Sequence, residues 1–200
     1  MSTNPTKFLI THSLLSSWSW VFKTETGYDD FIRTLNRIPT PMTQAILEGN
    51  QFETMVSRFN EGFEPDPGHK WYKGIKETAA IVKGSAEQVK LSKVKTVNGV
   101  DFLLYGILDN LRAGIIRDTK MSKGYSYGKY KDSTQHPMYF ELCPEAYKFE
   151  YVVFNGKDVY TEPYYKYDTE PIDKIIAQFM EWLDRHGLVD LYADKWMSKW

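Results

Sequence analysis

The sequence of 200 residues contains a single cysteine, Cys143. One thiol cannot build a disulfide framework or a four-cysteine site for zinc or an iron–sulfur cluster, so we expect a reducing, cytosolic setting. No stretch approaches the ~18 apolar residues that a membrane span requires, and the N-terminus lacks the basic and apolar regions of a secretory signal. These absences predict a cytoplasmic protein without a membrane partner.

The sequence also lacks an excess of charge of one sign, since its net charge is −1. This argues against a protein that coats nucleic acid through bulk positive charge. The charges are nevertheless unevenly distributed. Residues 70–95 carry seven lysines and two glutamates, a balance of +5, and residues 117–131 carry five basic residues and one acid, a balance of +4. Residues 158–200, with nine acids and five basic residues, have a balance of −4. Unless these runs are only solvated faces, an anionic partner is expected to bind the middle of the chain.

The overall composition, with 42% hydrophobic and 26% charged residues, is typical of a globular domain. Periodicity and capping signals predict helices over residues 13–23, 28–36, from the cap Thr43 to residue 60, 71–82, 134–144 and 171–186. Apolar or alternating runs predict strands over residues 88–97, 100–110, 114–121, 149–154 and 159–166. The order predicts one α/β domain over residues 1–200, with N-terminal helices within 1–85 and a central mixed sheet flanked by helices.

The turns between the predicted strands define how the sheet begins. Asn98-Gly99 is a strong two-residue hairpin signal, and Ala113-Gly114 makes the next tight turn. Three strands joined by two tight turns predict an antiparallel meander.

The stretch that carries the chemistry is residues 106–120, GILDNLRAGIIRDTK. Asp109 lies at the end of one predicted strand and Asp118 on the next, so adjacent antiparallel strands can bring their carboxylates together. Lys120 projects from the same face as Asp118 because side chains alternate along a strand. Two such carboxylates repel unless a cation lies between them, and hard oxygen ligands suit Mg²⁺ or Mn²⁺. A lysine beside the ion can orient or deprotonate water, which is the chemistry of phosphodiester hydrolysis.

These residues resemble the PD-(D/E)xK nuclease superfamily, within it the RecB-like and phage-type exonuclease branch. The family places an acid near the end of one strand and an acid-x-lysine on the next, which match Asp109 and Asp118-Thr119-Lys120. A helix then carries a glutamine with a tyrosine four residues later, which match Gln135 and Tyr139. The proline that names the family is absent, since Ile107-Leu108 precedes Asp109.

The family also carries an acid or histidine on an earlier helix, after a glycine and an apolar residue, and the run from Gly49 to Glu53 matches this setting. The resemblance implies a restriction-endonuclease-like core over residues 43–165. The missing side chain of Gly49 is expected to let its helix approach the sheet, so that Glu53 points between the two aspartates.

The resemblance implies a Mg²⁺- or Mn²⁺-dependent nuclease that acts on DNA, as duplex ends or single strands, and has no iron–sulfur cluster. Lys120 would activate or position the attacking water. The metal ligands would be Glu53, Asp109, Asp118 and the backbone carbonyl of Thr119. The substrate-binding residues would be Gln135, Tyr139, Lys123, Lys129 and Lys131, through contacts with the nucleic-acid backbone.

Several alternatives remain open at the level of sequence. The resemblance favours an exonuclease used in recombination, repair or phage DNA metabolism, in a bacterial or phage-infected cell, as a homo-oligomer or with a protein partner. The same site would also serve a structure- or sequence-specific endonuclease, and the fold could be retained in a non-catalytic binding module. His69 and His136 are interpreted as bystanders, and His12 with Ser13 lacks the context of a nucleophilic triad.

Overall fold

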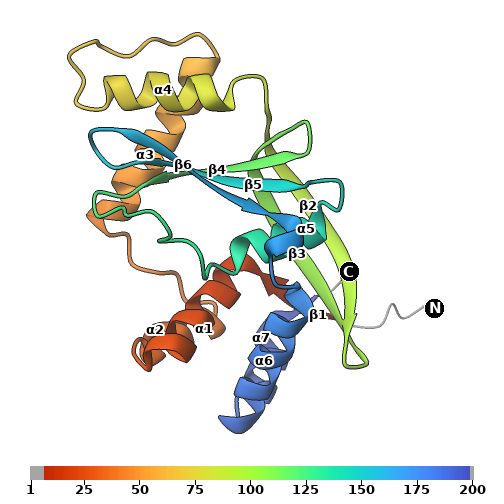
Figure 1. The fold of residues 1–200 in the computed structure, drawn as a ribbon. Helices are drawn as coiled ribbons and strands as arrows, with labels where there is room; N and C mark the ends of the chain where they lie inside the picture. Colours follow the sequence, from red (N-terminus) through yellow and green to blue (C-terminus); the bar gives the residue numbers. More distant parts are fainter. Residues whose placement is uncertain (1–6, 199–200) are drawn as a thin grey trace.

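A mixed seven-stranded sheet forms the centre of the computed structural model, which describes residues 7–198 (Figure 1). The elements in chain order are β1 Lys7–Thr11, α1 His12–Thr24, α2 Tyr28–Leu35, α3 Gln44–Asn60, α4 Tyr72–Val82, β2 Ala86–Val97, β3 Val100–Arg112, β4 Ile115–Met121, α5 Gln135–Leu142, β5 Lys148–Phe154, β6 Val159–Tyr165, a 3₁₀ turn Lys166–Asp168, α6 Ile172–Arg185, α7 Val189–Trp196 and β7 Met197–Ser198. The predicted α/β class is confirmed. None of the helices within residues 7–198 is long and apolar enough to cross a membrane.

The strand order is β6-β5-β4-β3-β1-β7, and β2 pairs with the other edge of β3. The predicted meander of β2, β3 and β4 is confirmed, because both of its pairings are antiparallel. Two parallel pairings, β1 with β3 and β4 with β5, make the sheet mixed. The predicted cap of α3 is also correct, since the Thr43 side chain accepts a hydrogen bond from the amide of Ile46.

One edge of β3 is shared by two strands that diverge from each other. β1 pairs with β3 from Phe102 to Tyr105, and β4 pairs with it only from Asn110 to Arg112. Because β2 occupies the opposite edge along the full length, residues 106–109 have no partner strand on this edge. We call this gap the fork.

Tyr139 of α5 fills the fork. Its hydroxyl donates a hydrogen bond to the backbone oxygen of Ile107, with 2.8 Å between the two oxygens. The close packing depends on Gly106, because a Cβ there would lie 2.8 Å from both the Tyr139 ring and the Leu142 side chain. An α-helical side chain thus replaces a missing strand partner.

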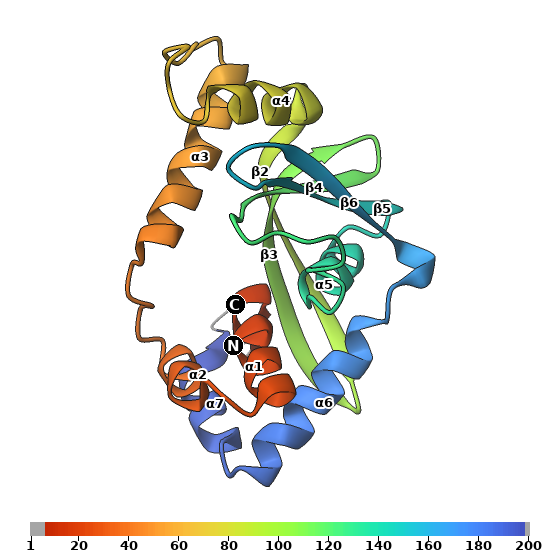
Figure 2. The ribbon, with the colours of Figure 1, turned by 60° about the vertical axis from the view of Figure 1, so that its left-hand side comes forward.

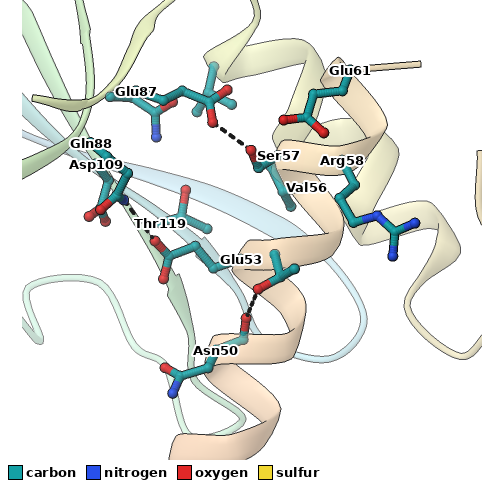
Figure 3. A pocket seen from close by; sticks show the side chains of 13 residues that line it. Asn50, Glu53, Val56, Ser57, Arg58, Glu61, Glu87, Gln88, Asp109 and Thr119 are labelled. Atoms are coloured by element: carbon teal, nitrogen blue, oxygen red, sulfur yellow. Dashed lines mark hydrogen bonds between the residues drawn. The ribbon is translucent and has the colours of Figure 1, made fainter. Parts of the chain in front are cut away.

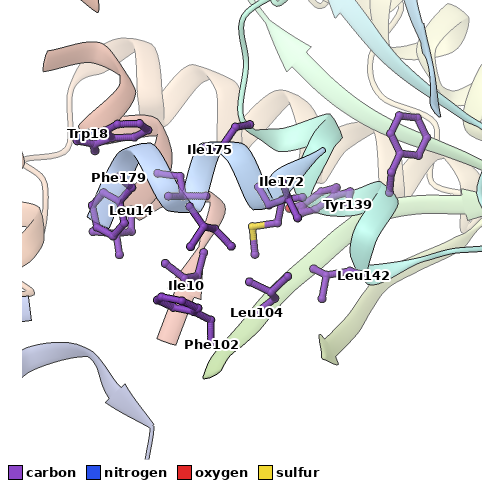
Figure 4. Close-up of a cluster of buried hydrophobic side chains, with 14 of the residues drawn as sticks. Ile10, Leu14, Trp18, Phe102, Leu104, Tyr139, Leu142, Ile172, Ile175 and Phe179 are labelled. Carbon is purple, nitrogen blue, oxygen red and sulfur yellow. The ribbon is translucent and has the colours of Figure 1, made fainter. Parts of the chain in front are cut away.

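The sheet is covered on both faces. The larger core lies between one face and α1, α2, α5, α6 and α7, and includes Leu14, Leu104, Tyr139 and Phe179 (Figure 4). The smaller core lies under α3 and α4, where Phe52 stacks on Phe154 with ring centroids 4.9 Å apart. Figure 2 shows α3 as an arm that runs from the end of the molecule with α1 and α2 to the end with α4.

The two ends of the chain differ from the prediction. The N-terminal region, predicted as helical, begins its described part with strand β1, and the helix predicted as the last is followed by α7 and β7. Both strands are short and take their hydrogen bonds from partners distant in sequence, so local periodicity does not reveal them. Residues 1–6 and 199–200 of the predicted domain lie outside the described residues.

The predicted role of Gly49 is wrong. A Cβ at Gly49 would meet no atom within 4 Å, so its missing side chain does not bring α3 toward the sheet. Phe52 and Val56, both buried, make that approach instead.

Replacing the two glycines separates close packing from helix propensity. Gly106→Ala would force a methyl group against Tyr139, and overpacking of this kind costs about 1–3 kcal/mol of unfolding free energy. Gly49→Ala should gain about 0.5–1 kcal/mol, since alanine is the better helix residue and the site is open. Urea unfolding of both variants measures the difference. Equal stability of the two variants would contradict the packing described at the fork.

Candidate active site

Three of the predicted site residues meet where β4 leaves β3. Asp118 is 2% exposed, and its Oδ2 lies 2.6 Å from Nζ of Lys120, two residues along the same strand face. Its Oδ1 accepts a hydrogen bond from the side-chain amide of Gln135. Asp109 is half-buried on β3 beside Asp118, one residue beyond the last β3–β4 pair. The structure therefore brings Asp109, Asp118 and Lys120 together as predicted.

The Asp109 carboxyl has two acidic neighbours, whose negative charge the nearby Lys120 only partly offsets. Burial, followed by the charges of Asp118 and Glu53, raises the pKa of Asp109 from its ordinary value of 3.8 to about 8. Lys120 acts in the opposite direction but is the weaker influence. At neutral pH the carboxyl is therefore mostly protonated in the protein without a bound cation.

Lys120 is held in its charged form. Burial acts to lower the pKa of this ammonium group, but the carboxylates of Asp118 and Asp109 outweigh it and raise the pKa above the ordinary value of 10.5. An ammonium group of this kind can neutralise a phosphate or position a water molecule by hydrogen bonding. It is unsuited to accept a proton, so of the two predicted roles the geometry favours positioning.

Glu53 reaches the same site from the opposite side. It projects from α3 into a cavity of about 490 Å³, which Asp109 and Thr119 also line (Figure 3). Burial and the nearby Asp118 charge raise the pKa of its carboxyl above the ordinary value of 4.5. Its Oε1 accepts a hydrogen bond of 3.4 Å from the side-chain amide of Gln88. Glu53 thus lies close enough to the aspartates to interact with them electrostatically, while its role as a metal ligand stays a prediction.

The backbone of Gln88, next to the site, has a strained conformation. It stands on β2 between two residues that pair with Asn110 and Leu108, and so lies opposite Asp109. Its φ of 51° is left-handed, a conformation that costs a non-glycine residue of order 1–3 kcal/mol and that clusters at functional sites. Sequence reasoning missed this residue, because nothing in its neighbours distinguishes it from an ordinary strand residue.

The carboxylate oxygens of Glu53, Asp109 and Asp118 are suitable ligands for a hard divalent cation, but the three side chains are too far apart to bind one ion together. Asp118 Oδ2 is buried, and the Lys120 ammonium 2.6 Å away compensates its charge. Asp109 beside it is a second oxygen donor whose proton a cation would displace. Within residues 7–198, however, no three His, Cys, Asp or Glu side chains converge closely enough to hold a metal ion. Glu53 would have to move inward to become the third ligand.

Gln135 and Tyr139 share one face of α5, but neither is placed to contact a substrate. Gln135 is 4% exposed, and its side-chain amide donates a hydrogen bond to Asp118 and not to Lys120. Tyr139 is 6% exposed, and its hydroxyl bonds the backbone of β3. Tyr139 therefore braces the strand beside the site. Pro137 falls in the first turn of α5, where its missing amide proton costs nothing.

The three predicted lysines all lie exposed on the connection between β4 and α5. Lys123 pairs with Glu48 of α3 at 2.9 Å, and Lys129 donates a hydrogen bond of 2.6 Å to the hydroxyl of Ser122. Lys131 lies two residues further along this connection. None of the three lines the cavity that Glu53, Asp109 and Thr119 share.

One histidine that the sequence did not assign stands at the site. His12 begins α1 directly after β1 ends beside the fork, and its Nδ1 is 3.2 Å from the Thr134 hydroxyl. Burial and the nearby Lys120 charge lower the pKa of His12 to about 4, so the ring is neutral. The sequence did not reveal this proximity, because His12 lies far from both aspartates along the chain. His69 lies in a loop and His136 is buried on Tyr164, which agrees with the interpretation of both as bystanders.

Comparison with known proteins adds information on the fold. No protein-family model and no curated protein sequence matches the chain. Among solved structures, the chain is similar to the one titled "Crystal structure of SSO0001", with a TM-score of 0.53 and 17% sequence identity. The similarity covers 90% of this chain and 77% of that chain. At this level of identity it shows a shared fold alone.

The raised pKa of Asp109 predicts a pH dependence of stability. Without divalent ions, the folded protein keeps this proton up to a pH of about 8, whereas the unfolded chain loses it near the ordinary value of 3.8. Between these values the unfolded state binds fewer protons, so the unfolding free energy falls as pH rises. Asp109→Asn removes this loss, and its gain in melting temperature over wild type should grow from acidic to slightly alkaline pH. Thermal unfolding with a chelator measures it, with Asp101→Asn at the β2–β3 turn as control. A gain that does not change with pH would contradict the buried charge cluster.

Proposed function

We propose that this protein is a Mg²⁺- or Mn²⁺-dependent nuclease that hydrolyses phosphodiester bonds in DNA. The observation that carries the proposal is the meeting of Asp109, Asp118 and Lys120 at the fork, where the Asp118 carboxylate lies 2.6 Å from the Lys120 ammonium. Burial and the neighbouring acids also raise the pKa of Asp109. Acid and acid-x-lysine on neighbouring strands are also the residues by which the sequence resembles the PD-(D/E)xK superfamily.

Each side chain has a distinct part in this proposal. Asp118, oriented by Gln135, and Asp109 would hold the ion together with the backbone carbonyl of Thr119, and Glu53 would complete the site from α3. The ion would supply Lewis-acid polarisation of the scissile phosphate. Lys120, fixed as an ammonium group by Asp118, would position the attacking water and offset charge that develops on the phosphate.

The exposed lysines on the β4–α5 connection support a polyanionic substrate. Lys123, Lys129 and Lys131 contribute sequence-independent contacts that weaken with salt. We propose an exonuclease acting on DNA ends, and incubation with linear and with closed circular duplex DNA in Mn²⁺ tests it. Loss of the linear DNA alone would support an exonuclease. Cleavage of the closed circular DNA would support an endonuclease. If neither DNA is cleaved, the nuclease proposal fails and the non-catalytic binding module is favoured. The proposed setting is the cytoplasm of a bacterial or phage-infected cell.

Removing either half of the ion pair should abolish the activity. Asp118→Ala and Lys120→Ala are each expected to lower the rate of Mn²⁺-dependent DNA cleavage by at least about 100-fold, because removing one group that stabilises charge in the transition state costs about 10²–10³ in kcat. The matched control is Lys174→Ala, which removes an exposed lysine of a surface pair on α6. Cleavage by either site variant at the control's rate would refute the assignment.

Glu53 is tested by binding of the ion, independently of cleavage. Without metal, Glu53→Gln should be slightly more stable than wild type, because the repulsion between the Glu53 and Asp118 charges is gone. With Mn²⁺ it should gain less in melting temperature than wild type; for comparison, an ion at 100 times its dissociation constant stabilises by about 2.7 kcal/mol. An equal Mn²⁺-induced shift in both proteins would remove Glu53 from the site.

A further inference from the structure

The 13 residues between β4 and α5, residues 122–134, form a loop that connects two parts of the site. The loop begins two residues after Lys120 and ends one residue before Gln135, whose amide orients Asp118. It contains no helix or strand. Backbone hydrogen bonds close turns within the loop, and the Ser122 amide bonds the Phe154 carbonyl of β5, but none of these bonds ties residues 124–131 to the sheet. Side-chain contacts have to hold this middle part in place.

A buried carboxylate on β6 supplies that hold. Glu162 is 1% exposed and accepts hydrogen bonds from the Tyr125 hydroxyl at 2.7 Å, the Gly128 amide at 3.1 Å and the Tyr130 amide at 3.2 Å. The Tyr164 hydroxyl of its own strand is a fourth donor. Three of the four donors therefore belong to the loop. A carboxylate can accept all four at once because it has only acceptor sites.

Strand register places Glu162 in line with the site. Glu162 pairs with Tyr151 of β5, and Tyr151 pairs with Asp118 of β4, so the three side chains form a row on one face of the sheet. The loop crosses this row. Its Tyr130 ring stacks on Tyr151 with centroids 4.3 Å apart, which puts it beside Asp118 and Lys120.

Electrostatics agree with this placement. Burial raises the pKa of the Tyr130 hydroxyl, and the nearby Lys120 ammonium acts in the opposite direction. Burial acts to raise the pKa of Glu162 as well, but the donated hydrogen bonds outweigh it and keep the pKa below the ordinary value of 4.5. At neutral pH the acceptor is therefore ionised and the loop contacts are charge-assisted.

We propose that Glu162 is a positioning residue of the active site: it fixes loop 122–134 so that Tyr130 covers the Asp118–Lys120 pair. The inference rests on the proposed nuclease function for its catalytic consequence, but not for the ordering of the loop. Within residues 7–198, Glu162 makes no hydrogen bond or ion pair with Asp118 or Lys120, and it acts through Tyr130.

Glu162→Gln is the decisive variant, since it keeps the shape and turns one acceptor into a donor. The amide nitrogen would face backbone amides that can only donate, so at least one loop contact is lost. Hydrogen bonds to charged groups contribute about 1.5–3 kcal/mol, which corresponds to a loop that opens about 10–100 times more often. Tyr125→Phe removes one loop donor only and should give a smaller change in the same direction.

The first measurement is tryptic cleavage of the free protein after Lys129 and Lys131, mapped by mass spectrometry. Glu162→Gln should be nicked there at least about tenfold faster than wild type. The matched control is Glu150→Gln on β5, whose carboxylate is partly buried and pairs with Arg117 and Lys148 instead of the loop. Nicking of Glu162→Gln at the wild-type rate would overturn the proposal, and so would equal acceleration by Glu150→Gln.

The second measurement separates positioning from simple stability. On DNA with Mn²⁺, Glu162→Gln should lose about tenfold in kcat while the Mn²⁺-induced rise in melting temperature stays at the wild-type value, because the acids remain in place. Tyr130→Phe should lower kcat without faster nicking. A Glu162→Gln enzyme with a loosened loop and full kcat would refute the positioning role. If wild type cleaves no DNA, the nuclease proposal fails, and the tryptic comparison still decides whether Glu162 fixes the loop.

Discussion

The unpaired edge of β3 at residues 106–109 is the constraint on which the site depends. β1 and β4 use the same edge but diverge, and a buried carbonyl left without a donor in that gap would cost about 1–3 kcal/mol. Tyr139 satisfies the Ile107 carbonyl from α5, and Gly106 makes room for it. Because backbone pairing stops there, the Asp109 side chain can stand between two strands and beside the acid of β4.

The fork then gathers more negative charge than it neutralises. Asp118 has Gln135 and Lys120 as partners. Asp109 lacks such partners, and burial and the neighbouring acids raise its pKa so that it tends to keep its proton. Such a cluster costs stability unless a cation or substrate completes it, which is a common signature of functional sites. Glu162, on the same face of the sheet, is buried too, but its charge is stabilised because four donors give it hydrogen bonds.

Residues of the candidate site could be predicted to the extent that they are neighbours along strands or helices. Asp118 and Lys120 share a face by the two-residue period, and the turn after β3 brings Asp109 to them. The partner of Gln135 and the closeness of His12 could not be predicted. Each depends on which residue from a distant segment fills the remaining space, and periodicity carries no such information.

The fold divides in the same way. The meander, with Asn98-Gly99 at its hairpin, and the helix that Thr43 caps could be predicted from local sequence, because a few adjacent residues decide turn conformation and capping. That Lys7–Thr11 is a strand, and that α3 approaches the sheet through Phe52 and not at Gly49, depends on contacts between distant segments. A short edge strand exists only where another strand offers hydrogen bonds, and a glycine promotes close approach only where a neighbour would otherwise collide. Both conditions are properties of the assembled sheet.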